Sequence, residues 1–364
     1  MKNNISKKAR VTGFVLLSLA AGMASAADLT SQEQLGQLLY FDTNLSDPNG
    51  QACVSCHTPV VGFVDPDSNL PVSEGVVLGM FGGRNTPSSG YAMFAPMLQQ
   101  DLTGTWIGGQ FWDGRATGNP ALDPNSLGDP LADQALGPFT NPVEMHNPDR
   151  ATVIADVAAS AYAALFQKVT GIDPAAVVLT DPVAVDAAYE QVALAIGKFE
   201  RTAGFAQFTS KYDAYLADCV AAVADPNVCP TGLNLDGTLN VEAQAIAAVH
   251  FTPRELEGMQ LFMNLNNNND GIPDPGEGAM CAACHVADWA VAPLAINVEP
   301  PKWMEKYVGK NTYPPVFTDF TFDNLGVPVN QEIAILKNVS AMPIDNGLGA
   351  IVGDPALNGA FKVM

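Results

Sequence analysis

Two short cysteine–histidine motifs are the residues of this chain best suited to chemistry. The pattern C-x-x-C-H occurs at residues 53–57 and again at residues 281–285. It is the attachment pattern of c-type haem, in which two thiols one helical turn apart bond two vinyl groups and the adjoining histidine faces the iron. The motifs predict two covalently attached c-type haems, the first held by Cys53, Cys56 and His57, and the second held by Cys281, Cys284 and His285.

A zinc site and a thioredoxin-like dithiol are the alternatives for such cysteine pairs. A redox dithiol has no need of a histidine after the second cysteine, and a zinc site built from four cysteines would not use it. The chain has only 4 histidines, and two of them occupy this position. This coincidence favours haem over both alternatives.

The N-terminus has the features of a secretory signal. Basic residues at positions 2, 7, 8 and 10 precede the apolar run 11–20, and Ala24-Ser25-Ala26 fits a signal-peptidase site. The apolar run is too short to span a bilayer. We therefore predict that residues 1–26 are a cleaved signal peptide, that the mature protein is periplasmic, and that it does not span the membrane.

Composition and charge narrow the class of partner. The chain of 364 residues carries 17 basic and 38 acidic residues, a net charge of −21. Without the four basic residues of the signal, 13 basic residues stand against 38 acidic ones, which gives −25. Such a charge excludes nucleic acid as the default partner. With 48% hydrophobic residues, the chain is long enough to form two domains with separate cores.

The remaining two cysteines, Cys219 and Cys229, flank the turn-forming sequence Asp225-Pro226-Asn227. In an oxidising compartment this arrangement predicts a disulfide that closes a surface loop, with no catalytic role.

Helix signals surround the two haem motifs. Capping boxes are predicted at residues 30–33 and 252–255, and residues 151–168 and 182–202 carry apolar residues at helical spacing. Residues 58–84 are rich in Gly, Pro and Asp and predict a loop. The predicted fold is mostly α: two cytochrome c-like domains, over residues 27–180 and 181–364, each with one covalently attached c-type haem and long ordered loops.

A calcium site is predicted between the second capping box and the second haem motif. The segment 266–277 matches an EF-hand loop, with Gly271 at the sixth position and an ordinary polar turn as the alternative. Its oxygen ligands would come from Asn266, Asn268, Asp270, Asp274 and Glu277.

Beyond residue 26, nearly the whole chain resembles the bacterial di-haem cytochrome c peroxidases and the related MauG-like enzymes. The resemblance rests on an ordered series of short motifs around the two haem motifs. They are Leu35-Gly36, Phe41-Asp42, Leu45-Ser46, Arg84-Asn85-Thr86-Pro87, Phe111-Trp112-Asp113-Gly114-Arg115, Gln134-Ala135, Pro142-Val143-Glu144-Met145, Phe199-Glu200-Arg201-Thr202, Gly258 and Leu261-Phe262.

The resemblance implies a division of labour between the two haems. Peroxide would be cleaved at the N-terminal haem, electrons would enter at the C-terminal haem, and Trp112 would bridge the two. Gln134 and Glu144 would lie on the distal side of the first haem, and Asn85 would bind calcium between the domains. A carboxylate such as Glu144 can move a proton between the peroxide oxygens, whereas Gln134 can only hold peroxide or water by hydrogen bonds.

Two departures from the family pattern matter. Many family members carry a histidine in the loop that corresponds to residues 58–84, where it blocks the first haem, but this loop has none. We expect an open N-terminal haem, with Met80 as the alternative ligand. The chain stops at Met364, before the family segment that supplies the sixth ligand of the second haem, so we expect the C-terminal domain to be truncated.

The resemblance and the residues together predict a periplasmic peroxidase that reduces hydrogen peroxide to water. Its electrons would come from a small redox protein, a cytochrome c or a cupredoxin, and a homodimer is the candidate assembly. A MauG-like enzyme that oxidises residues of a partner protein is the first alternative. A di-haem electron carrier without turnover is the second, although a carrier would have no use for Gln134 and Glu144.

Overall fold

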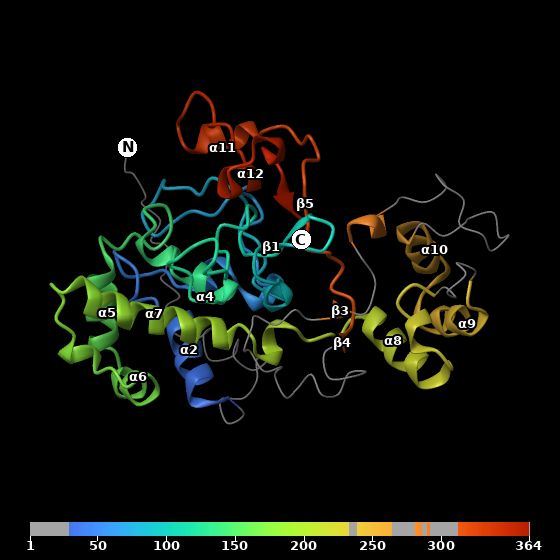
Figure 1. Ribbon diagram of the computed structural model, residues 1–364, viewed down its shortest axis with the longest axis horizontal. Coiled ribbons are helices and arrows are strands. Elements are labelled where there is room, and N and C mark those ends of the chain that lie inside the picture. The colour runs from blue at the N-terminus through green and yellow to red at the C-terminus, as the bar shows by residue number, and fades with distance from the viewer. Residues whose placement is uncertain (1–28, 233–238, 264–280, 286–289, 292–311, 364) are drawn as a thin grey trace, which may run out of the picture.

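The computed structural model describes residues 29–232, 239–263, 281–285, 290–291 and 312–363 (Figure 1). The predicted signal peptide and the predicted calcium loop 266–277 lie outside these ranges. Within them the fold is mostly helical, as predicted, with three two-stranded antiparallel sheets. No helix in the described part of the chain combines the length and the apolar character needed to cross a bilayer.

The N-terminal core is built around two helices, α2 (Ser31–Phe41) and α7 (Pro182–Phe199). Buried leucine, tyrosine and phenylalanine side chains from both helices pack together. Gly36 lets the two backbones approach closely, because a Cβ there would overlap the Ala195 carbonyl and lie 2.8 Å from Phe199 Cβ. Three further helices cover this pair: α4 (Pro130–Ala135), α5 (Arg150–Ala159) and α6 (Ala163–Thr170).

Both predicted capping boxes are confirmed. The Thr30 and Thr252 hydroxyls accept hydrogen bonds from the backbone N–H groups three residues on, at the starts of α2 and α10 (Pro253–Phe262). The helical stretch predicted over residues 151–168 is interrupted, because Ser160 adopts an extended backbone (ψ 158°). Its hydroxyl donates to the Val157 carbonyl at 2.7 Å and so satisfies a backbone group that would otherwise continue the helix.

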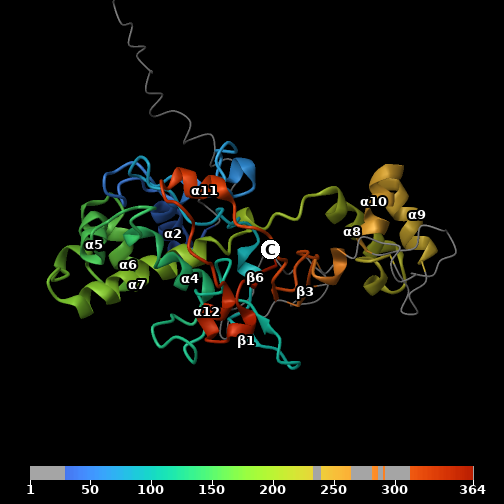
Figure 2. The ribbon, with the colours of Figure 1, turned by 90° about the horizontal axis from the view of Figure 1, so that it is seen from above.

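A second, smaller core lies apart from the first in both ribbon views (Figures 1 and 2). It is formed by α8 (Lys211–Ala222), α9 (Val241–His250) and α10 around the buried Tyr215 and Leu216. Cys219 and Cys229 form a disulfide inside this core, with a Cα–Cα distance of 5.8 Å. The disulfide joins α8 to the loop that leads toward α9.

The last part of the chain returns to the N-terminal core. The red segment that carries α11 (Gln331–Leu336) and α12 (Leu348–Val352) lies against the blue and green part of the chain in both views. Strand β5 (Phe322–Asp323) pairs with β6 (Phe361–Lys362), and the Phe320 carbonyl accepts from Gly108 N–H at 3.0 Å. The described C-terminal segment thus covers the N-terminal half.

Two features of the structure concern the predicted domain boundary after residue 180. Helix α7 begins at residue 182, yet its buried side chains belong to the N-terminal core. The segment 312–363 packs on the same half of the chain, where Leu98, Leu348 and Ala360 form a separate small buried cluster. The core that contains α2 therefore draws residues from both sides of the predicted boundary.

The close approach of α2 and α7 generates a stability prediction. Gly36→Ala should lower the free energy of unfolding by about 1–3 kcal/mol, because the added methyl group must push the two helices apart. Gly258→Ala, in α10 where nothing lies within 4 Å of the new Cβ, is the matched control. It should be neutral or stabilise by up to about 1 kcal/mol. Urea unfolding followed by circular dichroism measures both, and equal stabilities would contradict the packing argument.

Candidate haem sites

The first cysteine–histidine motif forms a single helical turn, α3 (Cys53–Cys56), that ends at His57. The His57 N–H donates to the Cys53 carbonyl at 2.9 Å, and the ring Nδ1 lies 3.2 Å from the Phe63 carbonyl oxygen. Neither Cys53 nor Cys56 is in a disulfide. Burial raises the pKa of both thiols, that of Cys56 to about 11, so both are neutral at physiological pH.

The second motif repeats this geometry. Residues 281–283 form the short helix η8 (Cys281–Ala283), and the His285 N–H donates to the Cys281 carbonyl at 2.9 Å. The ring Nδ1 of His285 lies 2.9 Å from the Phe317 carbonyl oxygen. Phe63 and Phe317 both have a left-handed backbone, with φ 62° and 57°, so the same rare conformation presents a carbonyl to each histidine.

These contacts fix which ring nitrogen is free. A carbonyl oxygen can only accept, so Nδ1 of each histidine must carry a proton, and in the neutral ring Nε2 then has the lone pair. A hydrogen bond of this kind orients a metal-bound imidazole and increases its basicity. Burial also lowers the pKa of His57 and favours the neutral ring that a metal requires.

A cavity of about 340 Å³ opens beside the first motif. Besides the motif itself, it is lined by residues that come from distant parts of the chain. The predicted site residues among them are Cys53, Cys56, His57, Asn85, Trp112, Gln134 and Glu144. His57 is the one histidine among the described residues that line the cavity, and Met80 is not among them.

The cavity wall fits a covalently attached haem. Two neutral thiols and an imidazole with a free Nε2 supply the attachment points and the iron ligand. Two buried polar atoms of the wall, Gln51 Oε1 and Glu200 Oε2, have no hydrogen-bond partner in the part of the chain that the structure describes. Such atoms are rare in folded proteins unless another group or water completes them. Around the second motif, the described residues provide the same two thiols and imidazole.

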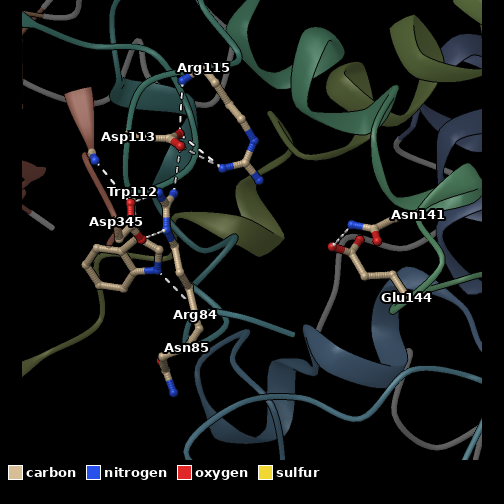
Figure 3. Close-up of polar contacts among 9 residues, drawn as sticks. Arg84, Asn85, Trp112, Asp113, Arg115, Asn141, Glu144 and Asp345 are labelled. Atoms are coloured by element: carbon tan, nitrogen blue, oxygen red, sulfur yellow. Dashed lines mark hydrogen bonds and ion pairs between the residues drawn. The ribbon is translucent and has the colours of Figure 1, made fainter. Parts of the chain in front are cut away.

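Glu144 is a half-buried carboxyl on this wall. Burial raises its pKa above the ordinary 4.5, while the charge of Arg115 and a hydrogen bond from Asn141 lower it. Asn141 Nδ2 donates to Glu144 Oε1 at 2.8 Å, and Figure 3 shows this pair apart from the arginine cluster described below. Gln134 reaches the same wall from α4. The structure thus brings together the two residues that the resemblance places on the distal side.

Asn85 and Trp112 are joined directly. Trp112 Nε1–H donates to the Asn85 carbonyl at 2.8 Å, and Asn85 Nδ2 donates to the Pro71 carbonyl at 3.2 Å. In the described ranges, no group of three or more His, Cys, Asp or Glu side chains is arranged to hold a metal ion. Calcium binding by Asn85 stays a prediction, as does calcium binding by the loop 266–277.

An ion-pair cluster holds the Trp112 segment to the end of the chain (Figure 3). Asp113, which is 5% exposed, accepts from Arg84 Nη1 at 2.8 Å and from Arg115 Nη1 at 3.0 Å. Arg84 also makes a bidentate contact with Asp345, at 2.7 Å for each bond. Arg84 therefore joins the Trp112 segment to a residue that lies 261 positions after it in the sequence.

A buried lysine continues this connection. The Lys362 N–H donates to the Trp112 carbonyl at 2.8 Å, and its Nζ donates to the Gly109 carbonyl at 2.7 Å. Burial lowers the pKa of Lys362 to about 7, against the attraction of Asp113. Its strand β6 pairs with β5, where the Asp323 carboxylate lies 3.6 Å from Cys284 Sγ. One strand pair thus contacts both the Trp112 segment and the second motif.

The sequence prediction assigned no role to several residues of the two sites. Asp345 and Lys362 carry no local signal, because their partners lie more than 250 positions away. Three other such residues, Arg84, Arg115 and Glu200, each lie inside a motif that carries the family resemblance. Their place in these motifs is the sequence signal that could have indicated a role.

The comparisons with known proteins agree with this geometry. The sequence profile described as "Di-haem cytochrome c peroxidase" matches residues 30–220, more than half of the chain. The chain belongs to the di-haem cytochrome c peroxidase family. Members carry two c-type haems, as both C-x-x-C-H motifs predict. The methylamine utilization protein MauG of Paracoccus denitrificans is 31% identical over 356 residues, which cover 96% of this chain and 71% of that protein.

Two further proteins are similar to this chain, one in sequence over a shorter stretch and one in its three-dimensional fold. The cytochrome c551 peroxidase of Pseudomonas aeruginosa is 34% identical over 116 residues, 32% of this chain and 25% of that protein. The crystal structure of the di-haem peroxidase BthA from Burkholderia thailandensis superposes with a TM-score of 0.63 and 24% identity. The match covers 92% of this chain and 65% of BthA, so it supports the fold.

The Arg84 cluster generates a prediction about local stability. Arg84→Ala should remove about 1–2 kcal/mol of charge-assisted hydrogen bonding between the Trp112 segment and residues 345–363. Amide hydrogen exchange in residues 345–363 should then be about 5- to 30-fold faster.

Arg150→Ala is the control, because Arg150 pairs with Asp186 at the same 2.7 Å but on an exposed surface. It should leave exchange in residues 345–363 unchanged. If Arg84→Ala also left the exchange rates of residues 345–363 unchanged, the Arg84 ion pairs would not stabilise this segment.

Proposed function

We propose that this protein is a periplasmic di-haem peroxidase that reduces hydrogen peroxide to water with electrons from a small redox protein, a cytochrome c or a cupredoxin. The observation that carries the proposal is the position of Glu144. This half-buried carboxyl, whose pKa is raised, shares a cavity with the first haem motif and with Gln134. Perturbed carboxyls in a cavity are typical of acid–base catalysis.

The chain's own residues would hold the cofactor in defined ways. Cys53 and Cys56 would form the thioether bonds, and Nε2 of His57 would bind the iron, with Nδ1 held by the Phe63 carbonyl. When bound, the haem supplies a redox-active iron at which peroxide can accept electrons. His285 and the two cysteines before it would hold the second haem in the same way.

Glu144 and Gln134 would manage protons and position. Peroxide reduction consumes two electrons and two protons for each two water molecules formed. The Glu144 carboxylate would accept the proton of one peroxide oxygen and return it to the other, which leaves as water. Its position in a partly dry wall lets it exchange this proton at neutral pH. The Gln134 amide would hold the peroxide by hydrogen bonds without exchanging protons.

The acidic chain would associate with its electron donor through charge. A net charge of −21 favours a donor with a basic docking surface and makes the association sensitive to salt. Electrons would enter at the second haem and reach the first cavity by way of Trp112, which lines that cavity.

A MauG-like activity, in which peroxide drives the oxidation of residues on a partner protein, is the second candidate. The observation in its favour is the 31% identity to MauG over 96% of this chain. The Glu144 chemistry serves both reactions, because both begin with cleavage of the peroxide bond. The two reactions differ in whether the electrons come from a soluble donor or from a protein side chain.

Removing the carboxylate of Glu144 tests the proposal. In the haem-loaded protein, Glu144→Gln should lower kcat/KM for hydrogen peroxide by about 10²–10⁴-fold, because the amide cannot shuttle a proton. Steady-state oxidation of a reduced cytochrome donor measures the effect. Glu257→Gln, at an exposed position of α10, is the matched control and should keep the activity of the parent protein.

Each other outcome has a defined meaning. Full activity in Glu144→Gln would remove Glu144 from the mechanism. Peroxide-driven oxidation of a partner protein with negligible turnover of the donor would favour the MauG-like reaction. A parent protein whose haems do not respond to peroxide would be an electron carrier.

The neighbours of Glu144 predict a pH effect. Since the carboxylate acts as the base, kcat/KM should fall as pH drops through the pKa of Glu144, which burial places above 4.5. Arg115 lowers this pKa, so Arg115→Gln should move the acidic limb of the pH–rate profile to higher pH. Arg254→Gln, at an exposed position of α10, should leave the limb in place. A limb that does not move in Arg115→Gln would show that another group controls it.

A further inference from the structure

A second carboxyl, Glu200, lies in the wall of the first cavity and has no part in the proton transfer proposed for Glu144. It is the C-terminal cap residue of α7, and the whole residue is only 4% exposed. Its Oε2 is buried and has no hydrogen-bond partner among the described residues, although the residue borders the cavity. A buried carboxylate in this position is costly unless a counter-charge or a proton neutralises it.

Among the residues that the structure describes, no cation forms an ion pair with Glu200. The adjacent Arg201 is committed to Asp129, at the start of α4, with Nη2 and Oδ1 2.7 Å apart. It also donates from Nη1 to the Gly197 carbonyl at 3.0 Å. The groups that face Glu200 from α2 and α3 are Tyr40 and Cys53, both neutral at physiological pH. Across the cavity, Glu144 is a further carboxyl.

We propose that Glu200 takes up one proton when the first haem site takes up one electron, so that the redox potential of this site depends on pH. The inference rests on the proposed function, in which the electron comes from the small redox protein. In this proposal Glu200 binds the proton that accompanies electron uptake, whereas Glu144 transfers the proton between the peroxide oxygens.

The physical argument follows from charge in a dry cavity. Adding one electron to the site would remove one unit of positive charge from the cavity that Glu200 lines. In a medium of low dielectric constant this change favours the neutral carboxyl over the carboxylate. The step balances: the donor loses one electron, the site gains it, and the Glu200 carboxylate binds one proton from solvent.

The direction of the pH effect is fixed by this coupling. Burial raises the pKa of Glu200 to about 8, against the attraction of Arg201 and with a smaller repulsion from Asp129. Reduction raises the pKa further. Between the pKa values of the oxidised and reduced states, the carboxylate must bind a proton for the electron to be accepted. Across that interval the redox potential therefore falls as pH rises.

Spectroelectrochemical titration of the haem-loaded protein between pH 6 and about pH 10 tests the proposal. The wave of the first site is identified with His57→Met, which changes the ligand of that site only. In the parent protein its midpoint potential should fall by up to about 59 mV per pH unit, the value for one proton per electron. Glu200→Gln, which keeps the shape but cannot ionise, should flatten this dependence. Glu144→Gln should retain it.

A dependence in Glu200→Gln equal to that of the parent protein would overturn the proposal, and so would a flat profile in the parent protein. Should Glu200→Gln fail to fold, infrared difference spectra of the parent protein decide, because reduction at alkaline pH must then produce a new protonated-carboxyl band. Absence of that band counts against Glu200. Peroxide turnover is measured separately, so a pH-dependent potential without turnover would refute the proposed function and leave this coupling intact.

Discussion

The hydrogen bond from His57 Nδ1 to the Phe63 carbonyl is the constraint on which the first site depends. It aims Nε2 away from the backbone and requires a left-handed conformation at Phe63, which the core must hold in place. The Phe63 ring stacks on Phe205, with centroids 4.5 Å apart, and Phe205 packs edge-on against Phe199 of α7. Tyr40 of α2 donates to the His57 carbonyl at 3.1 Å. The packing of α2 on α7 therefore fixes the direction of one imidazole.

The same core concentrates ionisable groups where water is scarce. Glu144, Glu200, Asp113 and Lys362 gather around one cavity and the Trp112 segment, whereas the pairs of Arg150 and Lys211 lie at the surface. Asp113 is compensated by two arginines, so it acts as a structural anchor. Among the described residues, Glu144 and Glu200 have no arginine in a direct ion pair; Arg115 and Arg201 lower their pKa values only in part, and burial raises both. A fold maintains uncompensated buried carboxyls at a cost, and functional sites are where such costs are found.

Sequence reasoning succeeded where the signal is local. The capping boxes at Thr30 and Thr252 and the one-turn helix of the first motif depend on contacts within a few residues. It failed where contacts span the chain. Nothing near Asp345 or Lys362 indicates that they meet Arg84 and Gly109, so the packing of residues 312–363 on the N-terminal core was not predicted. The meeting of Gln134 and Glu144 in one cavity came from the family resemblance, since their spacing alone carries no such information.

The strand pair β5–β6 explains why the end of the described chain matters to both sites. Lys362 is bonded through its backbone to Trp112, and its β5 partner strand carries Asp323, which faces Cys284. Backbone hydrogen bonds hold β6 against the Trp112 segment and against β5, whereas the contact of β5 with the second motif is made by side chains. The buried Lys362 ammonium then places a charge beside Trp112 whose strength depends on pH near neutrality. The strand pair that contacts both sites thus brings a charged group to each of them, Lys362 beside Trp112 and Asp323 beside Cys284.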